Sequence, residues 1–233
     1  MRLDKFLCDT LNLSRTDAKK VISAGRVTVE GALVKNVGLQ INEDSMVFLD
    51  GQQVEYQRFF YIMLHKPAGY VCANSDSRSK TVFDLLPAEY RKKDLFVCGR
   101  LDKDTTGLVL LTNNGALAHR ILAPKKCIYK EYIVTLRDKV SKEDIMRFEQ
   151  GIELQSGQRF APAFFEPNKP NCGLLKISEG KFHQIKRMFA ATGNEVVALH
   201  RRSIHGLTLD PGLPEGKCRY LTAEEIQGLE DVN

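Results

Sequence analysis

The chain has 233 residues, of which 43% are hydrophobic and 27% charged, and its formal net charge is +5 at pH 7. This composition is ordinary for a globular protein, and the length allows one large domain or a small domain beside a larger one. No apolar run approaches the ~20 residues that span a bilayer, and the N-terminus lacks the apolar core of a signal peptide, so we expect a cytoplasmic protein without membrane association.

The first 56 residues predict a small helical and β-hairpin module. Apolar side chains within residues 3–11 recur at helical spacing, and Ser14 is placed to cap a second helix that Gly25 can end. Two alternating segments with turn residues between them then predict a pair of hairpins within residues 27–56.

The segments LDKFL and LSRTDAKKVISAGRVTVEG, with the hairpin that follows, make residues 1–57 resemble the S-four-like RNA-binding domain, which is named after a ribosomal small-subunit protein. The resemblance implies an RNA-facing side whose phosphate contacts would position the RNA and carry little sequence information. The residues that it implicates are Arg2, Lys5, Ser14, Arg15, Lys19, Lys20 and Arg26.

Basic charge is concentrated in two distant segments. Lys and Arg outnumber Asp and Glu in residues 1–35 and again in residues 176–202, whereas residues 36–59 are acidic. This distribution is expected if two surfaces bind one nucleic acid, although solvated faces of ordinary helices would look the same.

Residues 58–233 predict a second, larger domain in which strands and helices come in mixed order. Such an order favours an α+β fold on a mixed, mainly antiparallel sheet. We expect strands at residues 59–64, 95–98, 108–112, 128–136, 174–178 and 195–199, and helices at residues 116–122, 141–150 and 182–191.

The most informative segment is CGRLDKDTTGLVLLTNNG, residues 98–115, in which two apolar strands flank a tight loop. Asp102 lies in this loop between glycines and beside the cations Arg100 and Lys103. Nearby cations keep a carboxylate ionised even when a bound substrate excludes water, which suits a reactive acid. An Asx-turn, in which Asp102 only accepts hydrogen bonds from its own backbone, is an equally good interpretation of the loop alone.

Two further segments give that loop a context. LHKPAGY, residues 64–70, predicts a strand that runs into a turn, and EGKFHQIKRMFAATG, residues 179–193, predicts a helix with His183, Lys186 and Arg187 near its start. Taken alone, the basic helix is more typical of a solvated or phosphate-binding face than of a catalytic one.

Together the three segments resemble the pseudouridine synthases, specifically the branch that modifies ribosomal RNA and carries an N-terminal S-four-like domain. By that resemblance Asp102 is the catalytic aspartate, Arg100 helps to open the RNA stack, and Tyr132 packs against the target uracil. Ile185 would line the base pocket, and Lys186 falls where many relatives have an arginine paired with the aspartate. Arg187, next to it, is predicted to contact RNA.

The resemblance implies an isomerisation: the bond from ribose to uracil nitrogen-1 breaks, the base rotates, and carbon-5 is attached instead. Neither redox chemistry nor hydrolysis is involved, and the sequence has no C-x-x-C or H-E-x-x-H spacing, so we expect no cofactor and no metal site. The partner would be ribosomal RNA, either free or in a ribonucleoprotein assembly intermediate, and the protein is expected to be a monomer. A compact C-terminus without a basic tail favours small-subunit (16S) rRNA over large-subunit rRNA.

Two other functions remain open at this stage. The D-x-D-x-T pattern of Asp102, Asp104 and Thr106 imitates the loop of aspartyl phosphatases, but Gly99 and Arg100 interrupt the strand that should lead into it. A non-catalytic rRNA-binding or ribosome-assembly factor would account for the N-terminal module and the basic segments, yet it leaves the GRLD loop unexplained.

Overall fold

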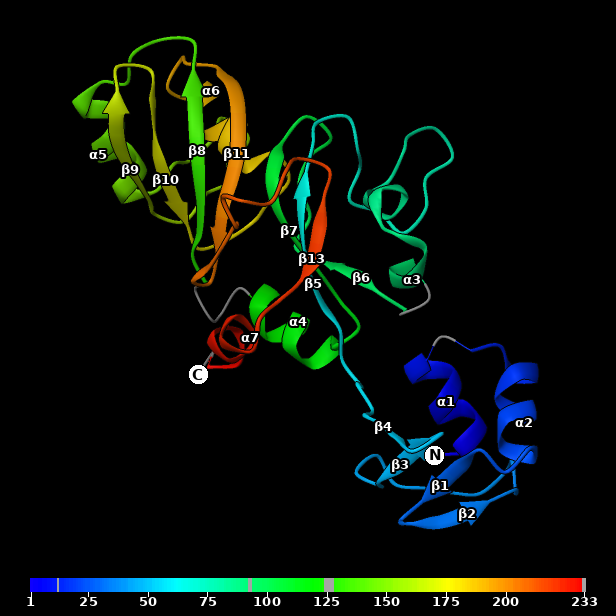
Figure 1. Ribbon diagram of the computed structural model, residues 1–233. Helices are drawn as coiled ribbons and strands as arrows, with labels where there is room; N and C mark the ends of the chain where they lie inside the picture. Colours follow the sequence, from blue (N-terminus) through cyan, green and yellow to red (C-terminus); the bar gives the residue numbers. More distant parts are fainter. Residues whose placement is uncertain (12, 92–93, 124–127, 232–233) are drawn as a thin grey trace. The chain divides into compact units, whose positions relative to one another are not determined.

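The computed structural model describes residues 1–233 apart from 12, 92–93, 124–127 and 232–233 (Figure 1). The chain forms two compact units, one of residues Met1–Phe60 with Ala88–Asp94 and one of Tyr61–Pro87 with Leu95–Asn233. The domain boundary that we expect after residue 57 stays a prediction.

The first unit combines two helices, α1 (Leu3–Leu11) and α2 (Arg15–Ser23), with an antiparallel sheet in the order β2-β1-β3-β4. Its strands are β1 (Val27–Val29), β2 (Ala32–Val34), β3 (Val47–Leu49) and β4 (Gln52–Val54), and the short helix α3 (Ala88–Arg91) also belongs to it. Leu3, Phe6 and Ile22 of the helices share one buried core with Val27 and Val47 of the sheet.

Local signals in the sequence account for these elements. The hydroxyl of Ser14 accepts a hydrogen bond of 3.1 Å from the backbone N–H of Asp17, so the predicted cap of α2 is confirmed. The first hairpin turns through Glu30 and Gly31, both at positive φ, which matches the twist of the strands that it joins.

The second unit is built on nine strands, seven of which follow the order β13-β5-β7-β11-β8-β10-β9, while β6 pairs with β7 and β12 with β11. Among the strands of this sheet that the structure describes, only β7 and β11 pair in parallel, so the predicted mixed, mainly antiparallel sheet is confirmed. The strands are β5 (Tyr61–Lys66), β6 (Phe96–Cys98), β7 (Thr106–Thr112), β8 (Lys130–Leu136), β9 (Ala163–Lys169), β10 (Cys172–Ile177), β11 (Val196–Ile204), β12 (Leu207–Thr208) and β13 (Cys218–Tyr220).

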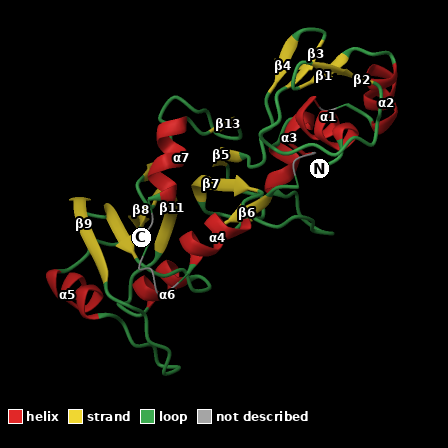
Figure 2. Ribbon diagram, turned by 90° about the horizontal axis from the view of Figure 1, so that it is seen from below, coloured by secondary structure: helices red, strands yellow, loops and turns green. Residues whose placement is uncertain are grey.

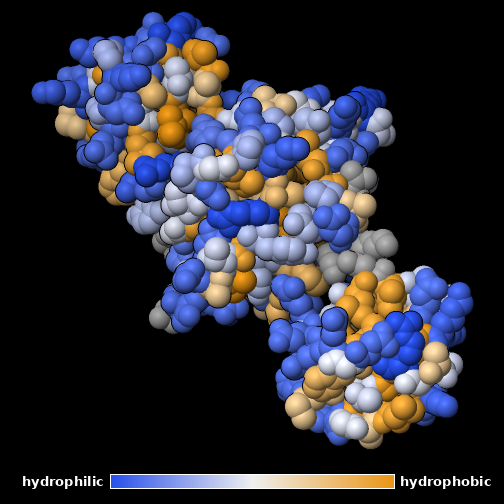
Figure 3. Space-filling view, viewed as in Figure 1, coloured by the Kyte–Doolittle hydropathy of each residue, from blue (hydrophilic) through white to orange (hydrophobic). Residues whose placement is uncertain are grey.

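Helices cover one face of the β9-β10-β8-β11 part of this sheet (Figure 2). Phe189 of α6 packs edge-on against Phe148 of α5 and Phe165 of β9, which fixes both helices to that face. The opposite face keeps Ile133 and Phe164 partly exposed, and hydrophobic side chains show there among polar ones (Figure 3). The helical segments of the unit are η1 (Val82–Leu85), α4 (Gly115–Leu122), α5 (Lys142–Gln150), α6 (Gln184–Ala190) and α7 (Ala223–Glu230).

The structure differs from the sequence prediction mainly after residue 160. Strands β9, β12 and β13 and helix α7 were not predicted, and β11 continues to Ile204 where we expect its end at residue 199. No helix within the described part of the chain combines the length and the apolar character that a membrane span requires.

Candidate active site

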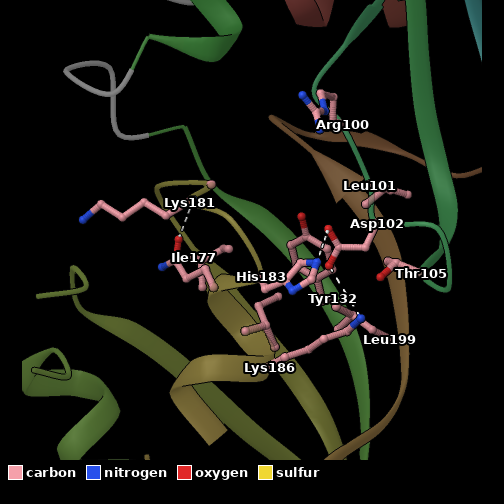
Figure 4. Close-up of a pocket in the computed structure, with 13 residues that line it drawn as sticks. Arg100, Leu101, Asp102, Thr105, Tyr132, Ile177, Lys181, His183, Lys186 and Leu199 are labelled. Carbon is pink, nitrogen blue, oxygen red and sulfur yellow. Dashed lines mark hydrogen bonds and ion pairs between the residues drawn. The ribbon is translucent and has the colours of Figure 1, made fainter. Parts of the chain in front are cut away.

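Asp102 lies in the loop between β6 and β7, and its carboxylate lines a small pocket that is open to solvent (Figure 4). The pocket also contains Arg100, Tyr132, Ile185 and Lys186. The structure therefore brings together all five residues that the sequence predicts for catalysis or uridine binding, although they come from three separate segments of the chain.

The first anchor of this loop is Lys66, at the end of β5. Its side chain is completely buried, and its ammonium group donates hydrogen bonds to the carbonyls of Thr105 at 2.6 Å, Lys103 at 3.2 Å and Pro67 at 3.0 Å. Burial lowers the pKa of the Lys66 ammonium group. The H-K-P segment thus acts on the Asp102 loop by holding its backbone.

The second anchor is Arg201 of β11, which is 1% exposed. Its guanidinium donates to the carbonyls of Gly99 and Leu108 at 2.8 Å each and to that of Arg100 at 3.4 Å. Gly107 lets β7 approach β11 closely, because a Cβ at this position would lie 2.3 Å from the carbonyl oxygen of Arg201. Arg201 belongs to the basic segment 176–202, which the sequence predicts to bind nucleic acid. The structure corrects this prediction for Arg201, because its side chain is buried beneath the loop.

Two cationic or potentially cationic groups face Asp102. The Lys186 ammonium lies 3.6 Å from one carboxylate oxygen, and Nε2 of His183 lies 3.7 Å from the other. Lys186 binds Asp104 more closely, at 2.6 and 2.7 Å, and this hydrogen-bonded pair lowers the pKa of Asp104. The lysine therefore divides its charge between two carboxylates, of which Asp102 is 28% and Asp104 71% exposed.

His183 owes its position to an unusual turn before α6. Its backbone adopts the left-handed conformation, with φ at 49°, and its ring stacks on Phe182 at a centroid distance of 3.8 Å. The turn is tied by buried Gln184, whose side chain accepts from the N–H of Lys181 and donates to Glu179. Sequence reasoning assigned no role to Gln184, although its place beside His183 in the G-x-x-HQ segment was a usable signal.

Apolar side chains form the walls of the pocket. Tyr132 of β8 and Ile185 of α6 are almost fully buried, and Ile177 and Leu199 line the pocket with them. Arg100 is exposed at the edge of the pocket (Figure 4). A pocket that combines apolar walls with several convergent polar groups suits a planar base whose polar edge must be oriented.

The carboxylate of Asp102 does not form the Asx-turn considered above. Among the described residues its ion-pair partners within 4 Å are Lys186 and His183, and no hydrogen bond from a backbone N–H to the carboxylate is found there. Its backbone carbonyl instead accepts from the N–H of Thr105 at 3.2 Å, which closes the turn and leaves the carboxylate directed at the pocket (Figure 4).

The cations predicted to face RNA in the first unit fall into two groups. Arg2, Lys5, Lys20 and Arg26 form ion pairs with Asp4, Asp9, Asp17 and Asp50 of the same unit. Arg15 and Lys19 are exposed on α2 and form no ion pair within the described residues. These predictions stay predictions, as does that for Arg187.

Arg187 lies half-buried on α6. Its guanidinium donates to the side chain of Gln158 at 2.6 Å and lies 5.2 Å above the ring of Phe160. Over the part of the chain that the structure describes, no group of three His, Cys, Asp or Glu side chains is arranged to hold a metal ion.

Comparisons with known proteins show the family to which the chain belongs. The model of the RNA pseudouridylate synthase family matches residues 60–191, and that of the S4 domain matches residues 1–47. Ribosomal small subunit pseudouridine synthase A of Escherichia coli (strain K12) is 44% identical over 98% of this chain and 100% of its own length. The uncharacterized RNA pseudouridine synthase YtzG of Bacillus subtilis (strain 168) is also 44% identical, over 99% of each chain.

A solved structure, described as a crystal structure of pseudouridylate synthase, has 40% sequence identity and a TM-score of 0.70. The match covers 98% of this chain and 99% of that one. These similarities decide against the aspartyl phosphatase alternative. With the GRLD aspartate set in a pocket beside Lys186 and an S4 domain at the N-terminus, the chain belongs to the RNA pseudouridylate synthase family.

Proposed function

We propose that this protein isomerises a uridine of small-subunit ribosomal RNA to pseudouridine, with Asp102 as the residue that acts on the nucleotide. The observation that carries the proposal is the Asp102 carboxylate, directed into a pocket of mixed polar and apolar side chains beside Lys186 and His183. Full-length similarity to relatives named ribosomal small subunit pseudouridine synthase A supports the choice of substrate.

A uridine inside stacked RNA cannot reach Asp102, so it has to be extruded at a cost of a few kcal/mol. Tyr132 and Ile185 offer the extruded uracil an apolar slot, which offsets part of that cost by stacking and burial. Arg100, at the edge of the pocket, is placed to occupy the gap that the base leaves in the stack.

Asp102 then attacks the sugar, attacks the ring, or removes a sugar proton. In each case the glycosidic bond to nitrogen-1 breaks and a bond from the ribose to carbon-5 forms. The proton of carbon-5 passes to water, and nitrogen-1 takes up a proton, so the reaction is an isomerisation. Each route needs an ionised carboxylate held against the nucleotide, and the nearby nitrogens of Lys186 and His183 stabilise that charge.

Lys186 is expected to support turnover through its positive charge. Replacing it with glutamine should lower kcat/KM by roughly 10- to 100-fold, because a partly shielded ion pair contributes about 1 to 3 kcal/mol. Lys186→Arg should recover part of the loss, since it keeps the charge but changes the geometry. Lys176→Gln is the control, because Lys176 pairs with Glu131 at 3.0 Å and is not a lining residue of the pocket. Equal losses for both glutamine variants would contradict the role.

The exposed cations of α2 are expected to dominate RNA binding by the first unit. Changing Arg15 and Lys19 to glutamine should weaken binding and reduce the slope of log affinity against log salt by about 2. A second double variant, Lys20→Gln with Arg26→Gln, removes the same charge from side chains that already pair with Asp17 and Asp50. In a salt titration this second variant should change the slope of log affinity against log salt less than the first. Identical slopes for the two variants would refute the idea that unpaired cations contribute more to RNA binding than paired ones.

The proposal further holds that the protein acts in the cytoplasm as a monomer, without cofactor or metal. Its test uses small-subunit rRNA with tritium at uracil carbon-5, supplied free and in a ribonucleoprotein assembly intermediate, without added metal. Tritium released to water reports the reaction, because carbon-5 becomes the point of attachment. Release from only one of the two RNAs would identify the substrate form. Release from large-subunit rRNA alone would overturn the substrate assignment, and no release from either RNA would favour a binding factor.

A further inference from the structure

The hydroxyl of Thr105 is buried at the active site without a partner. The residue is 1% exposed, and Oγ1 has no hydrogen bond to any described residue. Thr105 nevertheless lines the pocket, where its side chain lies beside Asp102 (Figure 4). A buried hydroxyl without a hydrogen bond destabilises the folded state, so its presence needs an explanation.

The backbone of Thr105 explains its position but not its hydroxyl. Its N–H donates to the backbone carbonyl of Asp102, and its carbonyl accepts from the Lys66 ammonium at 2.6 Å, so hydrogen bonds to its backbone hold the residue firmly. The adjacent Thr106 is a useful contrast, because its hydroxyl is hydrogen-bonded to Nδ1 of His200 at 2.9 Å. Thr10, the other residue with a buried unpartnered hydroxyl, belongs to α1 and is not among the residues that line this pocket.

We infer that Thr105 contacts the substrate, and that its hydroxyl forms a hydrogen bond with a polar atom of the target nucleoside. The inference rests on the proposed function and names one further group of the same site. Asp102 has to touch the nucleotide, and Thr105 is placed beside it by the same closed turn. The walls formed by Ile177, Ile185 and Leu199 offer no hydrogen bonds to a base or a ribose.

Without a nucleotide in the pocket, the Thr105 hydroxyl is not accessible to solvent. Side chains near Asp102 must therefore move when a nucleotide binds and contacts this hydroxyl. A hydroxyl that is satisfied only in the complex favours ligands that bring a polar atom to it and disfavours those that do not. Thr105 would thus contribute to the recognition of a nucleoside rather than of any flat apolar ring.

The test compares Thr105→Val, which keeps the side-chain volume and removes the hydroxyl, with Thr105→Ser, which keeps the hydroxyl. Thr106→Val is the matched control from the next residue. We measure tritium release under kcat/KM conditions, affinity for the RNA, and the thermal unfolding of the free protein. A second RNA carries 2′-deoxyuridine at the target, and its affinity for each variant is measured.

Thr105→Val should lower kcat/KM about tenfold, which corresponds to about 1.4 kcal/mol, while the free protein unfolds at the same or a higher temperature. Thr105→Ser should restore most of the activity. Thr106→Val should show the opposite pattern, with unchanged kcat/KM and a lower unfolding temperature. A merely structural hydroxyl would not separate activity from stability in this way.

The 2′-deoxyuridine RNA identifies the atom that is bound. If the effect of Thr105→Val on affinity disappears with this RNA, the partner is the ribose 2′-hydroxyl; if it persists, the partner is another polar atom of the nucleoside. Wild-type activity in Thr105→Val, or a lower unfolding temperature with full activity, would overturn the inference while leaving the proposed function intact. An inactive wild-type protein would overturn both.

Discussion

Asp102→Asn is expected to abolish pseudouridine formation, lowering the single-turnover rate by at least about 10⁴-fold. Asparagine has nearly the shape of aspartate, but it neither offers a carboxylate as nucleophile nor accepts a proton as a base. The substitution should leave the loop in place, because the backbone is held by Lys66 and Arg201 and not by the carboxylate. RNA affinity should therefore stay within a few-fold of the wild type.

The matched control is Asp104→Asn, two residues away in the same loop. It removes the same charge and the closer partner of Lys186, yet Asp104 is 71% exposed and belongs to the rim of the site. We expect a rate within about tenfold of the wild type, since exposed ion pairs contribute little. Tritium release and RNA binding are measured on both variants. Residual activity above about 1% in Asp102→Asn, or equal losses in both variants, would contradict the assignment of Asp102.

Residue patterns near the N-terminus were sufficient to predict the two helices and two hairpins of the first unit, but not its helix α3. The cap at Ser14 and the turn at Glu30 and Gly31 are local signals, because the residues that form them are adjacent in the chain. The same holds for the GRLD loop, whose flanking apolar segments become β6 and β7. Local chemistry determines these elements, so the sequence alone predicts them.

The elements that the sequence did not predict, such as β9 and α7, depend on contacts with distant segments or carry a local signal that the prediction did not use. Strand β9 contains Pro167 and pairs with β10 at the end of the strand order, where a proline costs little. Helix α7 carried a local signal, a capping box formed by Thr222 and Glu225, which we overlooked. Strand β11 continues past residue 199 because buried Arg201 donates to the carbonyls of Gly99, Arg100 and Leu108, which lie in another segment of the chain.

Family resemblance named the residues of the pocket, but their geometry was not predictable. Which carboxylate Lys186 approaches more closely depends on side-chain positions, and the structure favours Asp104 over Asp102. The placement of His183 depends on a left-handed turn that Gln184 ties together, and a sequence pattern does not specify such a conformation. The distances from Lys186 and His183 to the carboxylate determine how strongly its charge is stabilised, and only the structure provides them.

Arg201→Met is expected to destabilise the second unit by about 3 to 5 kcal/mol. The guanidinium is buried and donates to three carbonyls of the Asp102 loop and β7, and methionine would leave those carbonyls without donors. The backbone of Gly99 and Arg100 would then relax, and misplacement of Asp102 by about 1 Å is enough to lower turnover about 100-fold. Stability and activity should therefore fall together.

Arg202→Met is the matched control, because it makes the same change of charge and side chain one residue further along β11. Arg202 is exposed, so its loss should change the free energy of unfolding by no more than about 0.5 kcal/mol. Denaturant unfolding followed by hydrogen exchange in β7 and β11 measures both variants. Similar stabilities for the two would show that the carbonyls find other donors, and that Arg201 does not hold the loop. A large loss of unfolding free energy in Arg201→Met, with little loss in Arg202→Met, would show that Arg201 has a structural role and that its neighbour Arg202 is an ordinary surface charge.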